Sequence, residues 1–440
     1  MLTRDTNGAA LLGGVPLHEI LEPRGTIPTP AYVYDLDAIA AAARRLTAGF
    51  GSTRHLIAYA VKANTAGPIV RALAEVGCGA DVVSGGELAV ALGSGIAPDR
   101  ILFSGVAKTK AELDQAIGAG DRGILAIQIE SVEEIARIEA RAAALGRRAR
   151  TSIRINPGIE ADTHAHVATG HDEAKFGIAR EDLPAAWEAL RRAGHVDLLG
   201  LSFHVGSQLT RTDAYLAAAD TLLTIADERD AAIRSASSLA PAPLAFLDFG
   251  GGFGVDYGAG CDAEPADFAA AVTTRLARRG AAAPTIVVEP GRSLVAAHGV
   301  LCAGVIMDKR SAAGRRWLMI DAGMNDLIRP ALYGALHRIE PIGARPPDPQ
   351  AGAPRWRVVG PVCESSDDFG EHPFEDPPPA QVVIRDAGAY GFTMASQYNG
   401  RALPAEVFLR DGRIVAVNEA RSVEAWVADR IGIGISAAKT

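Results

Sequence analysis

The chain alternates short apolar runs with amphipathic segments from residue 57 to residue 290, and this rhythm constrains its fold more than any other feature. Helix-period segments such as Val132–Ala144 and Ala214–Ala232 separate runs that have the length of buried strands. We predict strands at Ile57–Val61, Ala80–Ser84, Ile101–Gly105, Ile124–Ile129, Ala149–Ile155, Leu198–Val205, Ala245–Phe249 and Thr285–Val288. Strands separated by helices pair in parallel, and eight of them can close into a barrel. The sequence therefore predicts an α/β fold built on a (β/α)8 TIM barrel, with an open doubly wound sheet as the structural alternative.

The pattern changes after Gly291, where long helical segments disappear. Apolar runs continue at Val300–Met307, Trp317–Asp321, Arg355–Val359, Gln381–Arg385, Ala405–Leu409 and Arg413–Val417. Such a series is typical of an antiparallel sheet, and it predicts a β-sandwich or barrel-like C-terminal domain. We therefore expect the barrel domain at residues 36–290, and a β-rich domain formed by residues 1–35 and 291–440.

Charge and composition restrict the possible partners. The chain has 52 acidic and 44 basic residues, and its formal net charge of -8 disfavours binding to nucleic acid or to an anionic membrane. Its apolar runs are too short to span a bilayer, and the N-terminus lacks the pattern of a secretory signal, so we predict a cytoplasmic protein. The four cysteines form no C-x-x-C pair and suggest neither a zinc site nor a disulfide framework.

Polar residues follow the predicted barrel strands, at the end where the active sites of such barrels lie. We expect one cavity to be ringed by Lys62, Asp81, Ser84, Arg154, Asn156, His204, Ser207, Asp248, Gly250–Gly252 and Glu289–Arg292. Taken singly, each has an ordinary structural explanation, such as an ion-paired lysine, a tight glycine turn or a buried histidine with a hydrogen-bond partner.

The chemistry of three of these positions suggests a function. An amine at the end of an apolar strand, as at Lys62, is partly desolvated and can attack an aldehyde. Glycines such as Gly250–Gly252 let backbone N–H groups approach a phosphate. A carboxylate such as Glu289 can hold a proton on a pyridine nitrogen, which turns the ring into an electron sink.

The loop after the fifth predicted strand contains His164, His166 and His171, but no H-E-x-x-H helix accompanies them. We expect a lid there and no metal site. In the β-rich domain, Arg329 suits a bidentate grip on a carboxylate, and Cys363 beside Glu364 could transfer a proton. The alternatives are a surface arginine and a cysteine that fills the core.

Read together, the motifs resemble the fold-type-III pyridoxal-phosphate decarboxylases, and within them the diaminopimelate decarboxylases. The resemblance covers about residues 28 to 430. It rests on Tyr59–Asn64, Asp81–Glu87, Phe103–Val106, Arg154–Gly158, Thr169–Gly170, Lys175–Ile178, His204–Gln208, Glu289–Arg292, Asp321–Tyr333, Gly360–Glu364 and Asp386–Gly391.

The resemblance implies a pyridoxal 5'-phosphate enzyme that converts meso-2,6-diaminopimelate to L-lysine and carbon dioxide, the last step of lysine biosynthesis. Lys62 would hold the cofactor as an imine, His204 would stack on its ring and Glu289 would face the ring nitrogen. The remaining cofactor-binding residues would be Asp81, Ser207, Gly250, Gly251, Gly252, Gly291, Arg292 and Tyr390.

The family also implies a homodimer with shared active sites. Arg292, Arg329 and Tyr333 would grip the distal carboxylate of the substrate. The partner subunit would contribute the proton donor Cys363, with Glu364 for the distal amine and Tyr390 for cofactor and substrate. The alternatives are a related decarboxylase of another basic or carrier-linked amino acid, an alanine racemase, and an inactive homologue that binds a partner protein.

Overall fold

The structure is a computed structural model that describes residues 1–159, 175–236, 243–258, 260–277, 283–348 and 352–432. The predicted lid histidines, His164, His166 and His171, and the Thr169–Gly170 motif lie outside these residues. The chain divides into two compact units. One comprises residues 40–256 and 260–293, and the other comprises residues 1–39, 257–259 and 294–440.

The first unit is a closed barrel in which every strand pairs with its sequence neighbours, and the last strand pairs with the first. All pairs are parallel. The strands are β5 (His55–Ala60), β6 (Gly79–Val82), β7 (Ile101–Phe103), β8 (Ala126–Ile129), β9 (Ala149–Ile155), β10 (Val196–Phe203), β11 (Phe246–Gly251) and β12 (Thr285–Glu289). Closure confirms the predicted TIM barrel and excludes the open sheet, because β12 pairs with β5 through Ile286 and His55.

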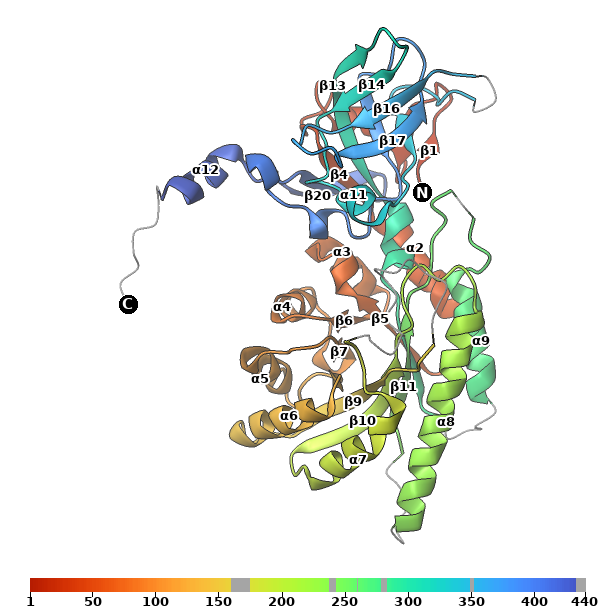
Figure 1. Ribbon diagram of the computed structural model, residues 1–440, viewed down its shortest axis with the longest axis vertical. Helices are drawn as coiled ribbons and strands as arrows, with labels where there is room; N and C mark the ends of the chain where they lie inside the picture. Colours follow the sequence, from red (N-terminus) through yellow and green to blue (C-terminus); the bar gives the residue numbers. More distant parts are fainter. Residues whose placement is uncertain (160–174, 237–242, 259, 278–282, 349–351, 433–440) are drawn as a thin grey trace. The chain divides into compact units, whose positions relative to one another are not determined.

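Helices surround the strands (Figure 1). They are α3 (Gly67–Glu75), α4 (Gly85–Gly93), α5 (Lys110–Gly118), α6 (Val132–Ala144), α7 (Leu183–Arg192), α8 (Asp213–Ala236) and α9 (Pro265–Ala277), with the short α10 (Arg292–Val295) after β12. Capping side chains mark the start of two of these helices. Thr109 and Glu112 form a capping box on α5. Ser84 caps α4 by accepting a hydrogen bond from the N–H of Glu87 at 3.2 Å, so this residue has a structural task.

Apolar side chains from several strands fill part of the barrel interior. Leu56 and Ala58 on β5 pack with Leu102, Ala126, Phe246 and Val287 in one buried cluster. Strands that are buried on both faces read as continuous apolar runs, which is why the sequence located them so readily.

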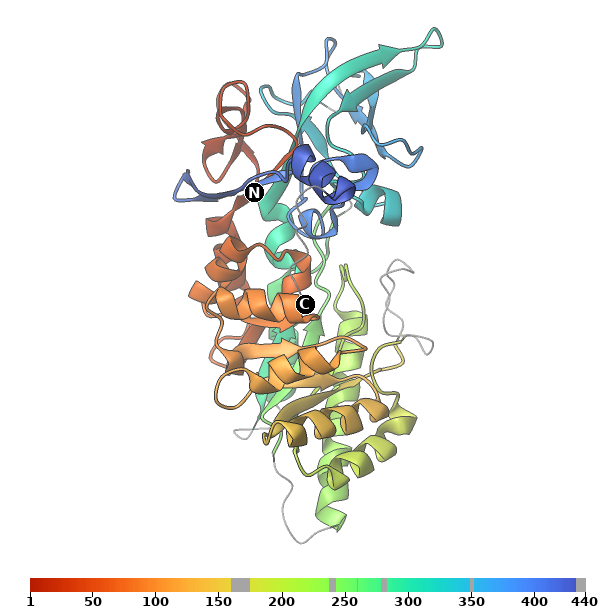
Figure 2. The ribbon, with the colours of Figure 1, turned by 90° about the vertical axis from the view of Figure 1, so that its left-hand side faces the viewer.

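The second unit is built on a nine-stranded sheet. Its main path runs through β17 (Asp368–Pro373), β16 (Arg355–Val359), β14 (Arg316–Ile320), β13 (Gly299–Arg310), β4 (Ala31–Asp35), β19 (Ala405–Arg410) and β20 (Arg413–Asn418). Two further strands, β15 (Ile339–Pro341) and β18 (Gln381–Ile384), pair with each other, and β18 also pairs with β13. Most pairs are antiparallel, as predicted for this part of the chain, but β4–β19 and β14–β16 are parallel. Figure 2 shows the long β13–β14 hairpin in teal.

Smaller elements complete the second unit. A three-stranded sheet comprises β1 (Thr3–Arg4), β2 (Ala10–Leu12) and β3 (Val15–Pro16), followed by α1 (Leu17–Ile20). The helices α11 (Arg329–Tyr333) and α12 (Val423–Ile431) belong to this unit, and the division between the units falls within α2 (Leu36–Ala48). No helix in the described part of the chain is long and apolar enough to cross a membrane.

Candidate active site

Lys62 lies in a short 3-10 helix, Val61–Ala63, that begins where β5 ends. Its Nζ donates to Oδ2 of Asp81, at the equivalent end of β6, over 2.9 Å. The Asp81 side chain is fully buried, whereas that of Lys62 is 36% exposed. The parallel pairing of β5 with β6 brings these two residues together. The result is an accessible amine held by a buried carboxylate.

Two neutral side chains connect this ion pair to further carboxyl groups inside the barrel. Ser104, after β7, donates to Oδ1 of Asp81, and its Oγ lies 3.5 Å from Oε1 of Glu289. Gln128 on β8 donates to Oε1 of Glu289 at 2.8 Å and to Oδ2 of Asp248 at 2.9 Å. Three acidic side chains thus share one buried network.

Burial makes this network hold a proton more tightly than exposed carboxyl groups would. It raises the pKa of Asp248 to about 6, and repulsion from Asp81 adds to the effect. The pKa of Glu289 is raised well above its usual value, by burial first and then by the charges of Asp248 and Asp81. Two such acids titrate as a pair, so the Asp248–Glu289 pair retains a proton at pH values where free carboxylates are ionised.

His204 follows β10 and faces the same network. Its Nδ1 accepts a hydrogen bond from the Gly251 N–H at 3.3 Å and lies 3.9 Å from Oε2 of Glu289. Burial and the positive charges of Arg154 and Lys62 lower its pKa well below the usual value. The imidazole is therefore neutral at neutral pH and carries its proton on Nε2. A neutral, flat ring in this position can stack on an aromatic ligand.

The glycine run Gly250–Gly252, whose first two residues end β11, has a structural explanation of its own. Gly250 and Gly252 have φ angles of +64° and +88°. A Cβ on Gly251 would lie 2.0 Å from the carbonyl oxygen of Glu289, and one on Gly250 would lie 2.3 Å from that of Phe203. Three backbone segments therefore meet too closely for side chains. The N–H groups of Gly250 and Gly251 donate to Oδ1 of Asp248 at 2.9 Å and to Nδ1 of His204 at 3.3 Å, so the turn is tied to the same buried network.

A second polar pair lies near the end of β12. Arg292 donates through Nη2 to the Ser207 Oγ at 3.0 Å, and the arginine is 9% exposed. Gly291 precedes it, and a Cβ there would touch Ala60 and Ala63 at 3.1 and 3.0 Å, so glycine allows the loop to pass close to the segment that carries Lys62. Arginine and hydroxyl groups of this kind bind phosphate oxygens.

Ser104 and Gln128, which join the acids, were not predicted as site residues. Glu130 was not predicted either, although its carboxylate accepts hydrogen bonds from Arg154, Gly105 and Gly177 at 2.9–3.0 Å. One signal was present. Gln128 is a polar residue within an otherwise apolar strand, where a buried amide needs partners on neighbouring strands.

Of the predicted substrate-binding residues, Arg292 belongs to the barrel unit, and the others lie in the second unit. Arg329 begins α11 and is 6% exposed, with Nη1 2.9 Å from Nε2 of His337. Tyr333 ends the same helix and is half-buried. Tyr390 is also half-buried and adopts a positive φ of +55°.

The Cys363–Glu364 pair lies at the surface of the second unit. The Cys363 thiol is exposed, and the residue's N–H donates to Oδ1 of Asn399 at 2.9 Å. The carboxylate of Glu364 accepts a hydrogen bond from the Tyr398 hydroxyl, and this contact raises the pKa of Tyr398. An exposed thiol beside a carboxylate is accessible to another molecule.

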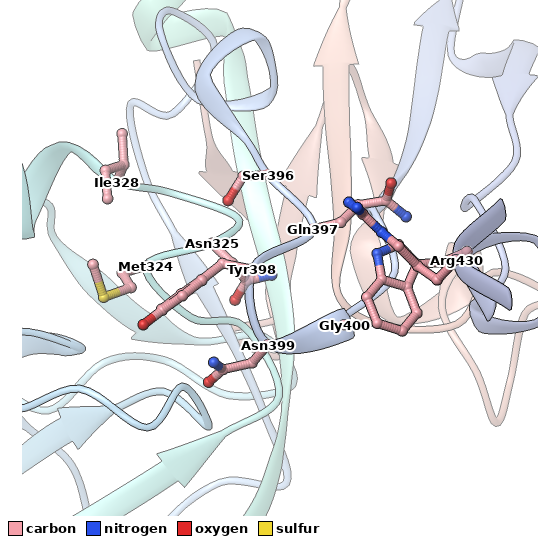
Figure 3. A pocket seen from close by; sticks show the side chains of 10 residues that line it. Met324, Asn325, Ile328, Ser396, Gln397, Tyr398, Asn399, Gly400 and Arg430 are labelled. Carbon is pink, nitrogen blue, oxygen red and sulfur yellow. The ribbon is translucent and has the colours of Figure 1, made fainter.

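A hollow of about 810 Å³ lies beside these residues in the second unit (Figure 3). Its lining comprises Met324, Asn325, Ile328, Ser396, Gln397, Tyr398, Asn399, Gly400, Trp426 and Arg430. Asn325 is 2% exposed and donates to Oδ1 of Asp326 at 2.9 Å, whereas its own Oδ1 has no hydrogen-bond partner among the residues that the structure describes. Among the residues with described positions, no group of His, Cys, Asp and Glu could hold a metal ion.

Asp326 should make the free energy of unfolding depend on pH. Burial raises its pKa to about 7, against about 3.9 in an unfolded chain. Between these values the folded state keeps a proton that the unfolded state has lost, so this residue makes the protein less stable as pH rises from about 4 to about 7. We expect Asp326→Asn to become more stable relative to the wild type from pH 5 to pH 8, by on the order of a few kcal/mol.

Urea unfolding at a series of pH values measures this change. The new amide at position 326 can donate to Oδ1 of Asn325 when the Asn325 amide is flipped by 180°. Asp99→Asn, at an exposed aspartate, is the control and should leave the pH profile of stability unchanged. An unaltered profile in Asp326→Asn would contradict the assignment.

Comparison with known proteins adds independent information. Residues 36–296 match the family model described as "Pyridoxal-dependent decarboxylase, pyridoxal binding domain". The chain is 38% identical to a diaminopimelate decarboxylase of Zymomonas mobilis over 96% of this chain and 97% of that protein. It is 37% identical to that of Pseudomonas aeruginosa, over 90% of each.

Solved structures give the same result. A crystal structure of diaminopimelate decarboxylase from Helicobacter pylori, complexed with L-lysine, has 37% identity and a TM-score of 0.81 over 93% of this chain and 98% of that one. The enzyme from M. jannaschii in co-complex with L-lysine has 31% identity and a TM-score of 0.83, over 98% of this chain and 97% of that one.

Proposed function

Because this chain belongs to the family of pyridoxal-dependent decarboxylases, we propose that it decarboxylates meso-2,6-diaminopimelate to L-lysine and carbon dioxide, the last step of lysine biosynthesis. The observation that carries the proposal is the similarity to diaminopimelate decarboxylases along nearly the whole chain, including the β-rich unit. The barrel supplies an amine, a buried proton-holding acid and a polar anion site, which together suit this cofactor.

The residues present fit pyridoxal 5'-phosphate. Lys62 offers an amine for the aldehyde, and Glu289 is a buried acid that the Ser104–Asp81 contacts connect to that amine. When bound, the cofactor accepts the electron pair that the departing carboxylate leaves behind. We propose that Gly250–Gly252, Gly291, Arg292 and Ser207 hold its phosphate.

Each remaining barrel residue has a defined task in this proposal. Asp81 holds the Lys62 amine by an ion pair at 2.9 Å. His204, kept neutral by burial and by two nearby cations, covers the face of the ring without adding charge. Glu289 keeps a proton at the ring nitrogen, and Gln128 fixes its carboxyl group by a hydrogen bond at 2.8 Å.

Most of the residues that we propose for substrate binding belong to the second unit. We propose that Arg329, Tyr333 and Arg292 bind the carboxylate at the far end of the substrate. We also propose a cytoplasmic homodimer in which each subunit gives Cys363, Glu364 and Tyr390 to the active site of the other. The exposed Cys363 thiol then donates the proton that replaces the lost carboxyl group, and Glu364 binds the distal amine.

Carbon dioxide release by the purified enzyme tests the function. We expect rapid turnover of meso-2,6-diaminopimelate and little of lysine, ornithine or arginine, because only the first substrate has a second carboxylate, at the end that does not react, for Arg329 to bind. Activity should fall when the cofactor is removed and return when pyridoxal 5'-phosphate is added. Preference for ornithine or arginine would assign the chain to another decarboxylase of the same family.

Mixing two inactive variants tests the shared sites. Lys62→Ala and Cys363→Ala damage different halves of each site, so a mixed dimer keeps one intact site and one doubly damaged site. After dissociation and random reassociation of equal amounts, we expect about a quarter of the wild-type activity, since half of the dimers are mixed. Either variant alone, taken through the same dissociation and reassociation, should remain inactive. A mixture as inactive as its components would argue that each site is made by one subunit.

A further inference from the structure

His337 contacts two groups whose chemistry fixes its protonation state. Its Nδ1 lies 2.9 Å from the carbonyl oxygen of Arg385, which can only accept a hydrogen bond. Its Nε2 lies 2.9 Å from Nη1 of Arg329, which can only donate. The imidazole must therefore carry its proton on Nδ1 and present a lone pair at Nε2. A doubly protonated ring would turn an N–H toward the guanidinium and lose this contact.

The local backbone holds this arrangement firmly. α11 ends at Tyr333, and Gly334 turns the chain back with a φ of +62°, so that His337 returns beside Arg329. The N–H of Arg385 donates to the carbonyl of Arg338 at 2.9 Å, beside the β15–β18 ladder. The carbonyl that accepts the His337 hydrogen bond thus belongs to the residue that directly follows β18, and His337 itself is 4% exposed.

Tyr257 is a second neighbour of the arginine. The Arg329 guanidinium carbon lies 4.8 Å from the centre of the Tyr257 ring, and the same ring meets His337 edge-on at 5.5 Å. Both contacts are with neutral groups. They orient the guanidinium without neutralising its charge, which a carboxylate in place of His337 would do.

We propose that His337 is a positioning residue that holds Arg329 ready for the far carboxylate of the substrate, and so sets selectivity for diamino acids with a second carboxylate. The inference rests on the proposed function. It adds that the neutral acceptor at Nε2, together with the ring of Tyr257, determines where the guanidinium points.

Ligand binding to the holoenzyme tests the inference without requiring turnover. L-lysine and 1,5-diaminopentane share both amines, but only L-lysine carries a carboxylate. We expect His337→Phe, which keeps a flat ring but has no acceptor, to weaken L-lysine binding 10- to 100-fold and 1,5-diaminopentane binding less than about twofold, since one charged-group hydrogen bond is at stake. Titration followed by cofactor absorbance measures both.

Two variants calibrate the result. Arg329→Ala should show the same ligand pattern, with a larger effect on L-lysine. His337→Gln keeps one donor and one acceptor on its amide and should restore L-lysine binding to within about fivefold of the wild type. In turnover of meso-2,6-diaminopimelate, His337→Phe should raise KM with kcat nearly unchanged, as expected when binding of the unreacting end is lost.

The outcomes separate the inference from the proposed function. Equal weakening of both ligands, or of neither, in His337→Phe would overturn the positioning role even if the wild type decarboxylates diaminopimelate. If the wild type bound L-lysine no better than 1,5-diaminopentane, the proposed selectivity for ligands with a carboxylate would be wrong. Nitrogen NMR shifts that place the His337 proton on Nε2 would refute the inferred hydrogen-bond chain. Failure of carbon dioxide release alone would count against the proposed function.

Discussion

Lys62→Ala should abolish decarboxylation, with a fall in kcat/KM of at least about 10⁴-fold, because no other amine in the described network replaces it in holding the cofactor. The variant should also lose the yellow absorbance of the lysine-bound cofactor. Its partner Asp81 is fully buried and would be left without this cation, so some loss of thermal stability should accompany the loss of activity. Carbon dioxide release, the absorbance spectrum and the melting temperature measure the three effects.

Two controls make the result specific. Lys62→Arg keeps a cation for Asp81 but cannot form the covalent link, so it should recover stability and not activity. Lys110→Ala removes an exposed lysine at the start of α5 and should change neither. Normal activity in Lys62→Ala would rule out the mechanism.

Glu289→Gln should lower kcat about 10²- to 10³-fold while the cofactor remains attached to Lys62. The substitution keeps the shape of the side chain but removes the acid that exchanges a proton with the ring nitrogen. It also changes the environment of Asp248, whose pKa is lowered by a side-chain hydrogen bond with Glu289. Single-turnover decarboxylation isolates the chemical step from product release.

Glu406→Gln is the matched control, since Glu406 is also a buried glutamate with a raised pKa but lies in the β-rich unit. It accepts a hydrogen bond from the Tyr34 hydroxyl at 3.0 Å, and its replacement should affect stability and spare kcat. If Glu289→Gln kept its kcat within a few-fold of the wild type, the acid would have no part in stabilising the developing charge.

Local sequence patterns located most regular elements of the barrel. The predicted strand Ala149–Ile155 and helix Val132–Ala144 agree residue for residue with β9 and α6. Elements with weaker patterns were missed, such as α12 and the short strand β15. Buried strands and amphipathic helices carry a periodicity that depends only on neighbouring residues, whereas short elements are stabilised by distant partners.

The candidate site was predictable where topology alone sets position. Residues after parallel strands had to gather at one end of the barrel, and Lys62, Asp81, His204 and Glu289 do so. The hydrogen-bond roles of Gln128 and Ser104 were not predictable. They depend on which oxygen of which acid each side chain reaches, and that is decided across the barrel.

The sequence by itself determined the β/α alternation, the positions of the reactive side chains along the chain and the family, because these reside in local spacing and residue chemistry. Only the tertiary structure decided that β12 pairs with β5 to close the barrel, and that Gly251 is required by the close approach of the Glu289 carbonyl. It also decided that His337 turns its lone pair toward Arg329. Hydrogen-bond partners and close backbone approaches join residues far apart in the chain, and local sequence carries no record of them.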